Sequence, residues 1–306
     1  MALTASCTGG GSGRGDDGRA PVTPPPAVSE SPRTPTGPVL AVKIDNVPQA
    51  RPQTGLDAAD IVYVEQVEGG LSRLMAVYAT RLPESVGPVR SARESDLELL
   101  RQFDEPLFAF SGAQGRLLPV IDGAPVRAET PETAADAYTR SSDRATPHNL
   151  YLRPDRLLSA PPGAAALTTG FTYGPAPREG GTAVDSRTVR YPAATYTFTW
   201  SPEEHRWLVA MDGREAVTTD AGAVAPATVV VQHVTVRPSV FHDSNGNYTP
   251  YTETVGSGTA EVLRDGKAYE AKWERPEGAD GTRFTTGDGK PLNFADGQVW
   301  VVFAER

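Results

Sequence analysis

The sequence predicts an N-terminal α/β or α+β domain with a mixed sheet, followed by a β-rich antiparallel C-terminal domain. Three features of the sequence favour this fold class. Apolar runs separated by turn residues start at Pro38, one clear helical pattern lies among them, and short strands alternate with turn dipeptides in residues 191–303. The chain of 306 residues is long enough for two buried cores.

Four apolar runs rich in Val, Ile, Leu and Tyr predict the strands of the first domain, which we place at residues 38–160. They cover residues 39–44, 59–67, 71–80 and 107–110. Ser91 and Glu94 match a capping box, and apolar residues follow at helical spacing. This pattern predicts a helix over roughly residues 92–103. A proline predicts a further short helix near residues 154–159.

Residues 161–190 are rich in Gly, Pro and Thr and predict a linker to a second domain at residues 191–306. Short alternating runs predict the strands of that domain, at residues 196–200, 206–211, 228–236, 260–263, 267–273 and 299–303. Turn dipeptides such as Asp265-Gly266 divide these runs, which is typical of antiparallel hairpins.

The composition excludes several classes of function. Lys and Arg total 29 against 38 Asp and Glu, a formal net charge of −9, so the chain has no bulk basic field to hold nucleic acid. No apolar run approaches the roughly 20 residues that a membrane-spanning helix needs. The spacing of Cys, His, Asp and Glu matches no metal site, and no phosphate-binding loop is present, so we expect neither a metal nor a cofactor.

Residues 1–37 predict a truncated lipoprotein signal followed by a disordered linker rich in Gly and Pro. Small residues precede Cys7, as at the end of a bacterial lipoprotein signal, where the cysteine receives the lipid. A charged segment and an apolar segment that would complete the signal are missing. Either the true start lies upstream and Cys7 anchors an extracytoplasmic protein to the cell membrane, or Cys7 is a stray thiol in the tail of a secreted or cytoplasmic protein.

Polar side chains stand at the ends of the predicted strands of the first domain. Asp45 and Asn46 close the first strand, Glu65 and Glu68 flank the end of the second, and Ser111 closes the fourth. Ligands of open α/β sheets bind beyond the carboxyl ends of parallel strands. We therefore expect these groups to converge if their strands run the same way.

The predicted hairpin at Gly69-Gly70 pairs residue 66 with residue 73 and places Glu68 and Arg73 within reach of a salt bridge. Glu65 lies in a strand that is apolar on both faces, so burial raises its pKa unless a cation or hydrogen bonds offset the desolvation. Such a carboxyl group suits a general acid, and it suits equally a structural ion pair with an arginine.

Two arginines, Arg90 and Arg93, flank Ser91 where the predicted helix begins. Positive charge at a helix N-terminus is unfavourable unless an anion is near. That anion is either a ligand phosphate or carboxylate, or an acidic side chain of the same fold, namely Asp45, Asp60 or Glu65.

His148 and Asn149 lie together in a predicted loop. The histidine suits an acid, a base or a ligand contact, and equally a solvated loop residue.

Several motifs occur in the order found in a known family. Val42-Lys43-Ile44-Asp45-Asn46, Val67-Glu68-Gly69-Gly70, Gly87-Pro88-Val89-Arg90-Ser91-Ala92-Arg93 and Pro147-His148-Asn149-Leu150-Tyr151 are the main ones. With Asp296-Gly297-Gln298-Val299-Trp300 near the end, the chain resembles the YerB-like lipoproteins, a family with N- and C-terminal domains of unknown function (DUF 3048). The resemblance implies a bacterial, envelope-exposed lipoprotein of two domains and supplies no reaction. Ser111 stands in a segment where relatives tend to carry a histidine.

Two hypotheses of function follow. In the first, the protein is a cell-envelope module whose cleft binds an anionic or glycan group of cell-wall polymer through Arg73, Arg90 and Arg93, with polar neighbours in support. In the second, it is a peptidoglycan or cell-surface glycan hydrolase, in which Glu65 or Glu68 is the acid and Asp45 is the second carboxylate. Arg73, Arg90 and His148 would then orient the substrate. The residues leave open whether the protein is an enzyme, with a lean toward binding.

Overall fold

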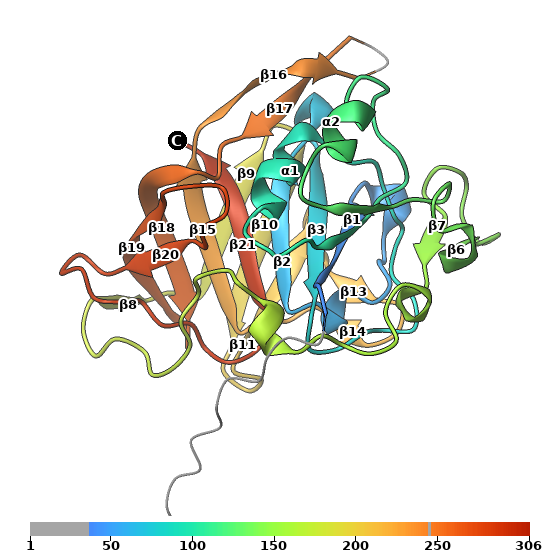
Figure 1. Cartoon of the computed structure of the whole chain (residues 1–306). Coiled ribbons are helices and arrows are strands. Elements are labelled where there is room, and N and C mark those ends of the chain that lie inside the picture. Colours follow the sequence, from blue (N-terminus) through green and yellow to red (C-terminus); the bar gives the residue numbers. More distant parts are fainter. Residues whose placement is uncertain (1–36, 244–245) are drawn as a thin grey trace, which may run out of the picture. The chain divides into compact units, whose positions relative to one another are not determined.

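The computed structural model describes residues 37–243 and 246–306, and within them the fold is built mainly of β-strands (Figure 1). The largest sheet has eleven strands. In chain order they are β1 (Leu40–Asp45), β2 (Ile61–Gln66), β3 (Ser72–Tyr78), β4 (Leu107–Ala109), β5 (Arg127–Glu129), β8 (Gly181–Ala183), β15 (Thr228–Val234), β18 (Gly256–Arg264), β19 (Lys267–Arg275), β20 (Arg283–Thr285) and β21 (Val299–Glu305).

Four smaller sheets complete the strands of the described residues. One has four strands, β9 (Ser186–Tyr191), β10 (Ala194–Ser201), β11 (Arg206–Met211) and β12 (Arg214–Glu215). The others are pairs: β6 (Tyr138–Arg140) with β7 (Leu150–Leu152), β13 (Val217–Thr218) with β14 (Gly222–Ala223), and β16 (Val236–His242) with β17 (Tyr248–Thr252).

Helices are short in the described residues. The α-helices are α1 (Glu94–Leu100) and α2 (Leu118–Asp122). Single 3-10 turns occur at Pro48–Ala50, Leu56–Ala58, Glu68–Gly70, Ala135–Ala137, Pro154–Arg156 and Ala164–Ala166. The mixed sheet and the β-rich C-terminal region agree with the predicted fold class, whereas the helical content of the N-terminal region is lower than an α/β domain would have.

The large sheet is mixed, and its strand order is β20-β19-β18-β15-β21-β2-β3-β1-β4-β5, with β8 paired to β19 beside this path. Strand β3 is antiparallel to both β1 and β2, β4 is parallel to β1, and β21 is parallel to β2. Strands β1, β2, β4 and β21 therefore run in one direction, and their carboxyl ends lie at the same edge of the sheet.

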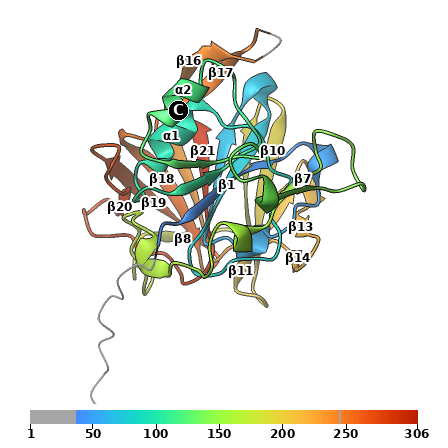
Figure 2. The ribbon, with the colours of Figure 1, turned by 45° about the vertical axis from the view of Figure 1, so that its right-hand side comes forward.

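Both faces of the large sheet are buried, which explains why most residues of its central strands are apolar and why the charged residues among them are buried as well. On one face α1 packs its leucines against Tyr63 and Met75. On the other face Tyr196, Phe198 and Trp207 of the four-stranded sheet pack against β2 and β3. Figure 2 shows α1 and strand β10 on opposite sides of the large sheet.

The two predicted domains share this sheet, since β21, from the end of the chain, lies between β2 and β15 and is parallel to both. The described residues accordingly form one unit by their contacts. The predicted linker at 161–190 carries β8 and most of β9. The domain boundaries read from the sequence stay predictions, but the C-terminal region is not purely antiparallel.

Two local predictions were shifted. Helix α1 begins at Glu94, with Arg93 rather than Ser91 before it, because residues 90–92 pair with residues 111–112: Ser111 N–H donates to Arg90 O and Ala92 N–H to Gly112 O. The backbone at Ser91 is thus extended. The Asp96 carboxylate, rather than Glu94, accepts the hydrogen bond from Arg93 N–H at 2.6 Å.

The β2–β3 connection is a three-residue turn at Glu68–Gly70, not the two-residue turn predicted. Gly69 and Gly70 have φ of 68° and 70°, the left-handed region that favours glycine. The longer turn shifts the register, so Glu65 rather than Gln66 lies opposite Arg73.

Candidate anion-binding site

The candidate site lies at the carboxyl ends of β1 and β2 and the beginning of β3. Asp45 on β1, Arg73 on β3 and Glu65 on β2 form one row across three neighbouring strands. Residues in register on adjacent strands point to the same face of a sheet, so these charged side chains stand together on the side of α1. The structure thus brings together charged residues that are far apart in the sequence.

A buried ion cluster forms the floor of the site. The Lys43 ammonium donates to Glu65 Oε2 and, at 2.5 Å, to Asp96 Oδ1, and the three side chains are 0%, 1% and 0% exposed. Burial raises the pKa of Glu65, Lys43 opposes this, and neighbouring Asp96 raises it further. The sequence therefore predicted the burial of Glu65 correctly, but its partner is a lysine and not an arginine.

The sequence predicted a salt bridge between Glu68 and Arg73, but Glu68 is bound by Arg93 instead. Arg93 Nε donates to Glu68 Oε1 and Arg93 Nη2 to Glu68 Oε2, both at 2.7 Å, in the forked geometry typical of arginine and carboxylate. Thr249, on the β16–β17 hairpin, donates to the same carboxylate at 2.5 Å. Burial opposes ionisation of Glu68, but Arg93 and Thr249 outweigh it and lower the pKa of this carboxyl group.

Asp45 binds both His148 and Arg90. His148 Nδ1 lies 2.8 Å and Arg90 Nε 3.1 Å from Asp45 Oδ2, and Asp45 is almost fully buried. Residues 86–90 bring Arg90 to this place, since Asp45 N–H donates to Pro88 O, Arg90 N–H to Lys43 O, and Val89 N–H to Leu150 O of β7. The Asp45 carboxylate thereby orients the histidine ring, and it is the internal anion that the sequence proposed for Arg90.

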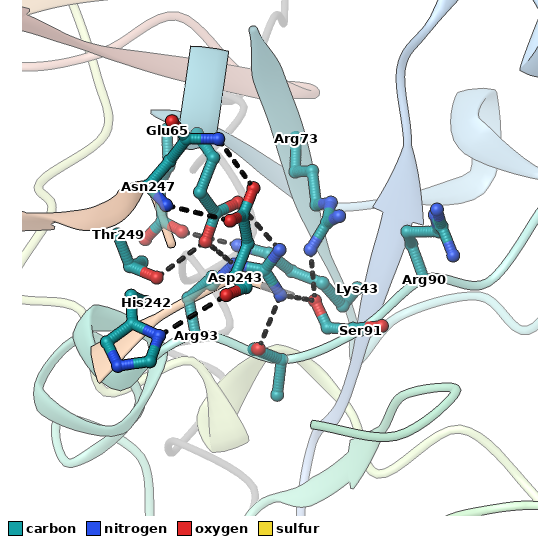
Figure 3. Close-up of polar contacts among 12 residues, drawn as sticks. Lys43, Glu65, Arg73, Arg90, Ser91, Arg93, His242, Asp243, Asn247 and Thr249 are labelled. Carbon is teal, nitrogen blue, oxygen red and sulfur yellow. Dashed lines mark hydrogen bonds and ion pairs between the residues drawn. The ribbon is translucent and has the colours of Figure 1, made fainter. Parts of the chain in front are cut away.

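Arg73 differs from its neighbours because it has no acidic partner. Its side chain is 9% exposed, its Nη1 donates to Ser91 O at 2.8 Å, and no carboxylate oxygen of the described residues lies within 4.0 Å of it. Arg93 donates to the main chain at Ser91 and Ala92, so Arg73 and Arg93 converge there, with Arg90 beside them (Figure 3). Burial and the positive charges of Arg93 and Arg90 lower the pKa of Arg73 to about 9, although the negative charges of Glu68 and Asp45 oppose this change.

The remaining predicted residues divide into two groups. The Ser91 and Ser111 hydroxyls lie at the site, 3.5 Å apart and half-buried. Asn46 faces away, donating to Ser72 and Tyr196 on the other side of the sheet. Asn149 accepts from Arg140 Nη1 at 2.8 Å and donates to Ser141 O, so it builds the adjoining loop.

Sequence reasoning missed Lys43, Asp96 and Thr249. A signal existed for Lys43, a single charge inside a buried apolar strand two residues before Asp45. Thr249 had none, because it reaches the site from a hairpin 181 residues after Glu68.

Guanidinium groups of the kind gathered here can form paired hydrogen bonds with a phosphate or carboxylate. The described residues contain no group of three or more His, Cys, Asp or Glu side chains that could hold a metal ion.

No helix of the described residues is long and apolar enough to cross a membrane. Cys7, the predicted lipidation site, lies outside the described residues.

Comparisons with known proteins agree with the resemblance seen in the sequence. Sequence models of both DUF3048 domains, each described as a protein of unknown function, match this chain, the N-terminal domain over residues 23–166 and the C-terminal domain over residues 187–301. The chain belongs to the DUF3048 family.

One relative is YerB of Bacillus subtilis (strain 168), which is named as a candidate lipoprotein. It is 28% identical over 277 residues, which cover 86% of this chain and 80% of that protein. The crystal structure of YerB from Bacillus subtilis has a TM-score of 0.71 to this chain, with 22% identity over 87% of this chain and 90% of that one. The two proteins share a fold.

Proposed function

We propose that this protein is an extracytoplasmic, lipid-anchored module that binds an anionic group of a cell-envelope polymer through the arginine cluster, defined as Arg73, Arg90 and Arg93. The observation that carries the proposal is the state of Arg73. Its guanidinium group is nearly buried, lies beside two further arginines and has no carboxylate partner among the described residues.

A buried charge without a counter-ion is destabilising, by several kcal/mol in the general case. A bound phosphate or carboxylate would offset that cost, and a planar guanidinium matches either anion with paired hydrogen bonds. The net charge of −9 disfavours binding of anions elsewhere on the surface. A local cluster of guanidinium groups therefore gives the protein a specific anion site without a general attraction for polyanions.

The extracytoplasmic location rests on two arguments. Small residues precede Cys7 as they do in bacterial lipoprotein signals, and the relative YerB carries the name of a candidate lipoprotein. An anchored protein on the outer side of the membrane meets cell-wall polymers, many of which are anionic.

The geometry favours binding over glycan hydrolysis. A hydrolase of the predicted kind needs one carboxylic acid and one free carboxylate on either side of a sugar. Glu65 is bound to Lys43 and is 1% exposed, while both oxygens of Glu68 accept hydrogen bonds from Arg93. Asp45 is bound to His148 and Arg90. Each candidate catalytic carboxylate is thus engaged by a cation of the same chain.

The test incubates the full chain with purified sacculi and measures both protein in the pellet and soluble fragments. We expect retention of the wild type without fragments, and weaker retention of Arg90→Ala, because this arginine is 25% exposed and can contact a ligand. Arg283→Ala is the matched control, since it removes an exposed arginine of β20, at the far end of the strand order. Fragments released by the wild type but not by Glu68→Gln would establish the hydrolase instead, and absence of retention would refute the proposal.

A further inference from the structure

A polar cavity of about 400 Å³ is lined by none of the three arginines of the cluster, and the proposed anion site does not use it. Side chains that can form hydrogen bonds line it, among them Ser85, Thr139, Arg140, Ser141, Arg144 and Tyr151. Hydroxyl and guanidinium groups of this kind bind anions and sugars rather than apolar ligands.

The charge of this cavity is positive although the chain as a whole is negative. Arg140 and Arg144 have no carboxylate oxygen of the described residues within 4.0 Å. Arg140 donates to Asn149 Oδ1, and Arg144 donates to the main-chain oxygens of Ala50 and Pro52 at 2.5 and 2.6 Å. Asp143 is the acidic residue in the lining. The lining therefore carries two positive charges and one negative charge, and neither guanidinium group forms an ion pair with a carboxylate of the described residues.

Two short segments connect this cavity to the arginine cluster. His148 binds Asp45, the ion-pair partner of Arg90, and the next residue, Asn149, binds Arg140 at the cavity. Ser85 lines the cavity, and five residues further on Arg90 belongs to the cluster. Five residues of chain span at most about 18 Å, so the two positive regions are within the reach of one extended ligand.

Close packing keeps the two regions in fixed positions. Gly87, between Ser85 and Arg90, lies so near β7 that a Cβ there would stand 2.8 Å from Leu150 O and from the Tyr151 ring. Val86 N–H donates to Leu152 O, and Val86 O accepts from Leu152 N–H, both at 2.8 Å. The segment is thus paired to β7 between the cavity and the cluster.

We infer that the ligand is a linear polyanion, a chain of repeated phosphate or carboxylate groups, one of which binds the arginine cluster while another binds the Arg140–Arg144 cavity. This inference rests on the proposed function, because the first of the two subsites is the anion site proposed there. A single anion fills one subsite only, whereas a chain gains from both, since binding at the first raises the local concentration of its next groups at the second.

The test measures binding of inorganic phosphate, long-chain polyphosphate and poly-glutamate to the full chain by calorimetry at low ionic strength. The informative variant is Arg140→Gln, which removes an exposed charge yet keeps a side-chain amide donor near Asn149. We expect it to weaken polyphosphate binding, poly-glutamate binding or both by roughly tenfold while phosphate binding changes by less than about twofold. The polymer that loses more identifies the repeated group. Arg283→Ala, the exposed control, should change none of these affinities.

The outcomes separate this inference from the proposed function. If Arg90→Ala weakens binding of all probes but Arg140→Gln weakens none, the second subsite is refuted and the first stands. If Arg90→Ala also leaves every affinity unchanged, or if no probe binds, the proposed function and the inference fail together. Equal loss of phosphate and polymer binding in Arg140→Gln would likewise overturn a separate second subsite.

Discussion

At the scale of single residues, the site is governed by how each buried charge is compensated. Lys43 binds Glu65 and Asp96, Asp45 binds His148 and Arg90, Glu68 is held by both ends of the Arg93 guanidinium, and Arg73 has no carboxylate oxygen of the described residues within 4.0 Å. Ion pairs with this degree of burial are costly to break and add little net stability. The uncompensated arginine is therefore the residue whose presence calls for a ligand.

The compensation at Glu65 predicts a pH dependence of stability. Burial raises the pKa of Glu65 in the folded protein above its ordinary value of 4.5. Between pH 4.5 and this raised pKa, the folded protein therefore keeps a proton on Glu65 that the unfolded chain releases. The free energy of unfolding contributed by this group is therefore fully present below pH 4.5 and is lost as the pH rises. Glu65→Gln is neutral at every pH, so its stability relative to the wild type should increase from about pH 5 to about pH 8 in urea unfolding.

Glu68→Gln is the control for that experiment, because the pKa of Glu68 is lowered. Its ionised form stabilises the fold above its ordinary pKa, and this contribution is lost in acid. As the pH rises from acid values, the free energy of unfolding of the wild type should therefore increase relative to that of Glu68→Gln. This is the opposite of the change expected relative to Glu65→Gln. A difference between wild type and Glu65→Gln that stays constant with pH would contradict the assignment of a raised pKa to Glu65.

At the scale of elements, acidic side chains of α1 accept hydrogen bonds that hold the β16–β17 hairpin in place beside the site. Glu98 accepts hydrogen bonds from the Tyr251 hydroxyl and from the main chain at Thr254, and Ser239 donates to Glu94. The same hairpin supplies Thr249 to Glu68. In both ribbon views the hairpin lies next to α1 (Figure 2). The C-terminal region therefore completes a site whose other residues come from the N-terminal region.

Because β21 pairs with β2 of the N-terminal region and with β15 of the C-terminal region, we predict that the two regions unfold together. Val64 on β2 is buried and lies in register with Val302 on β21, so Val64→Ala loosens the contact between strands of both regions. We expect a loss of about 2 kcal/mol in the free energy of unfolding. All four tryptophans lie after residue 199. Their fluorescence should nevertheless shift with far-UV circular dichroism, in one urea transition with a common midpoint.

Independent domains would give another result. The dichroism would then show two transitions, and Val64→Ala would leave the fluorescence midpoint where it is in the wild type. Thr139→Ala, an exposed position of β6, is a suitable control because it lies outside the large sheet and should change neither midpoint appreciably.

At the scale of the whole molecule, the sequence revealed strands better than their assembly. Apolar periodicity located strands β1 to β4 of the N-terminal region and β10, β11, β15, β18, β19 and β21 of the C-terminal region, because side-chain burial is a local signal, whereas the other strands were not predicted. The union of both regions in one sheet was not visible, since pairing of β2 with β21 joins residues more than 230 positions apart. Strand pairing over such a distance leaves no pattern in either segment.

The same division holds for the candidate site. Asp45 and Glu65 could be recognised from charge at the ends of apolar strands and Arg90 from its place before the predicted helix, and Asp45 was one of several anions proposed for Arg90. Partners that depend on register or on distant segments could not: a one-residue shift at the Gly69-Gly70 turn moved Glu65 opposite Arg73, and Glu68 then paired with Arg93. Which residues carry charge is read from the sequence, whereas which charges meet is decided by the fold.

The central claim is that Arg73 is kept without a counter-ion in order to bind an anion, and one measurement addresses it most directly. Calorimetry of inorganic phosphate binding at low ionic strength compares the wild type with Arg73→Met, which keeps the length of the side chain and removes its charge. We predict that the variant binds phosphate at least about tenfold more weakly and, without phosphate, is as stable as the wild type or more stable. Equal phosphate affinity of the two proteins would contradict the account.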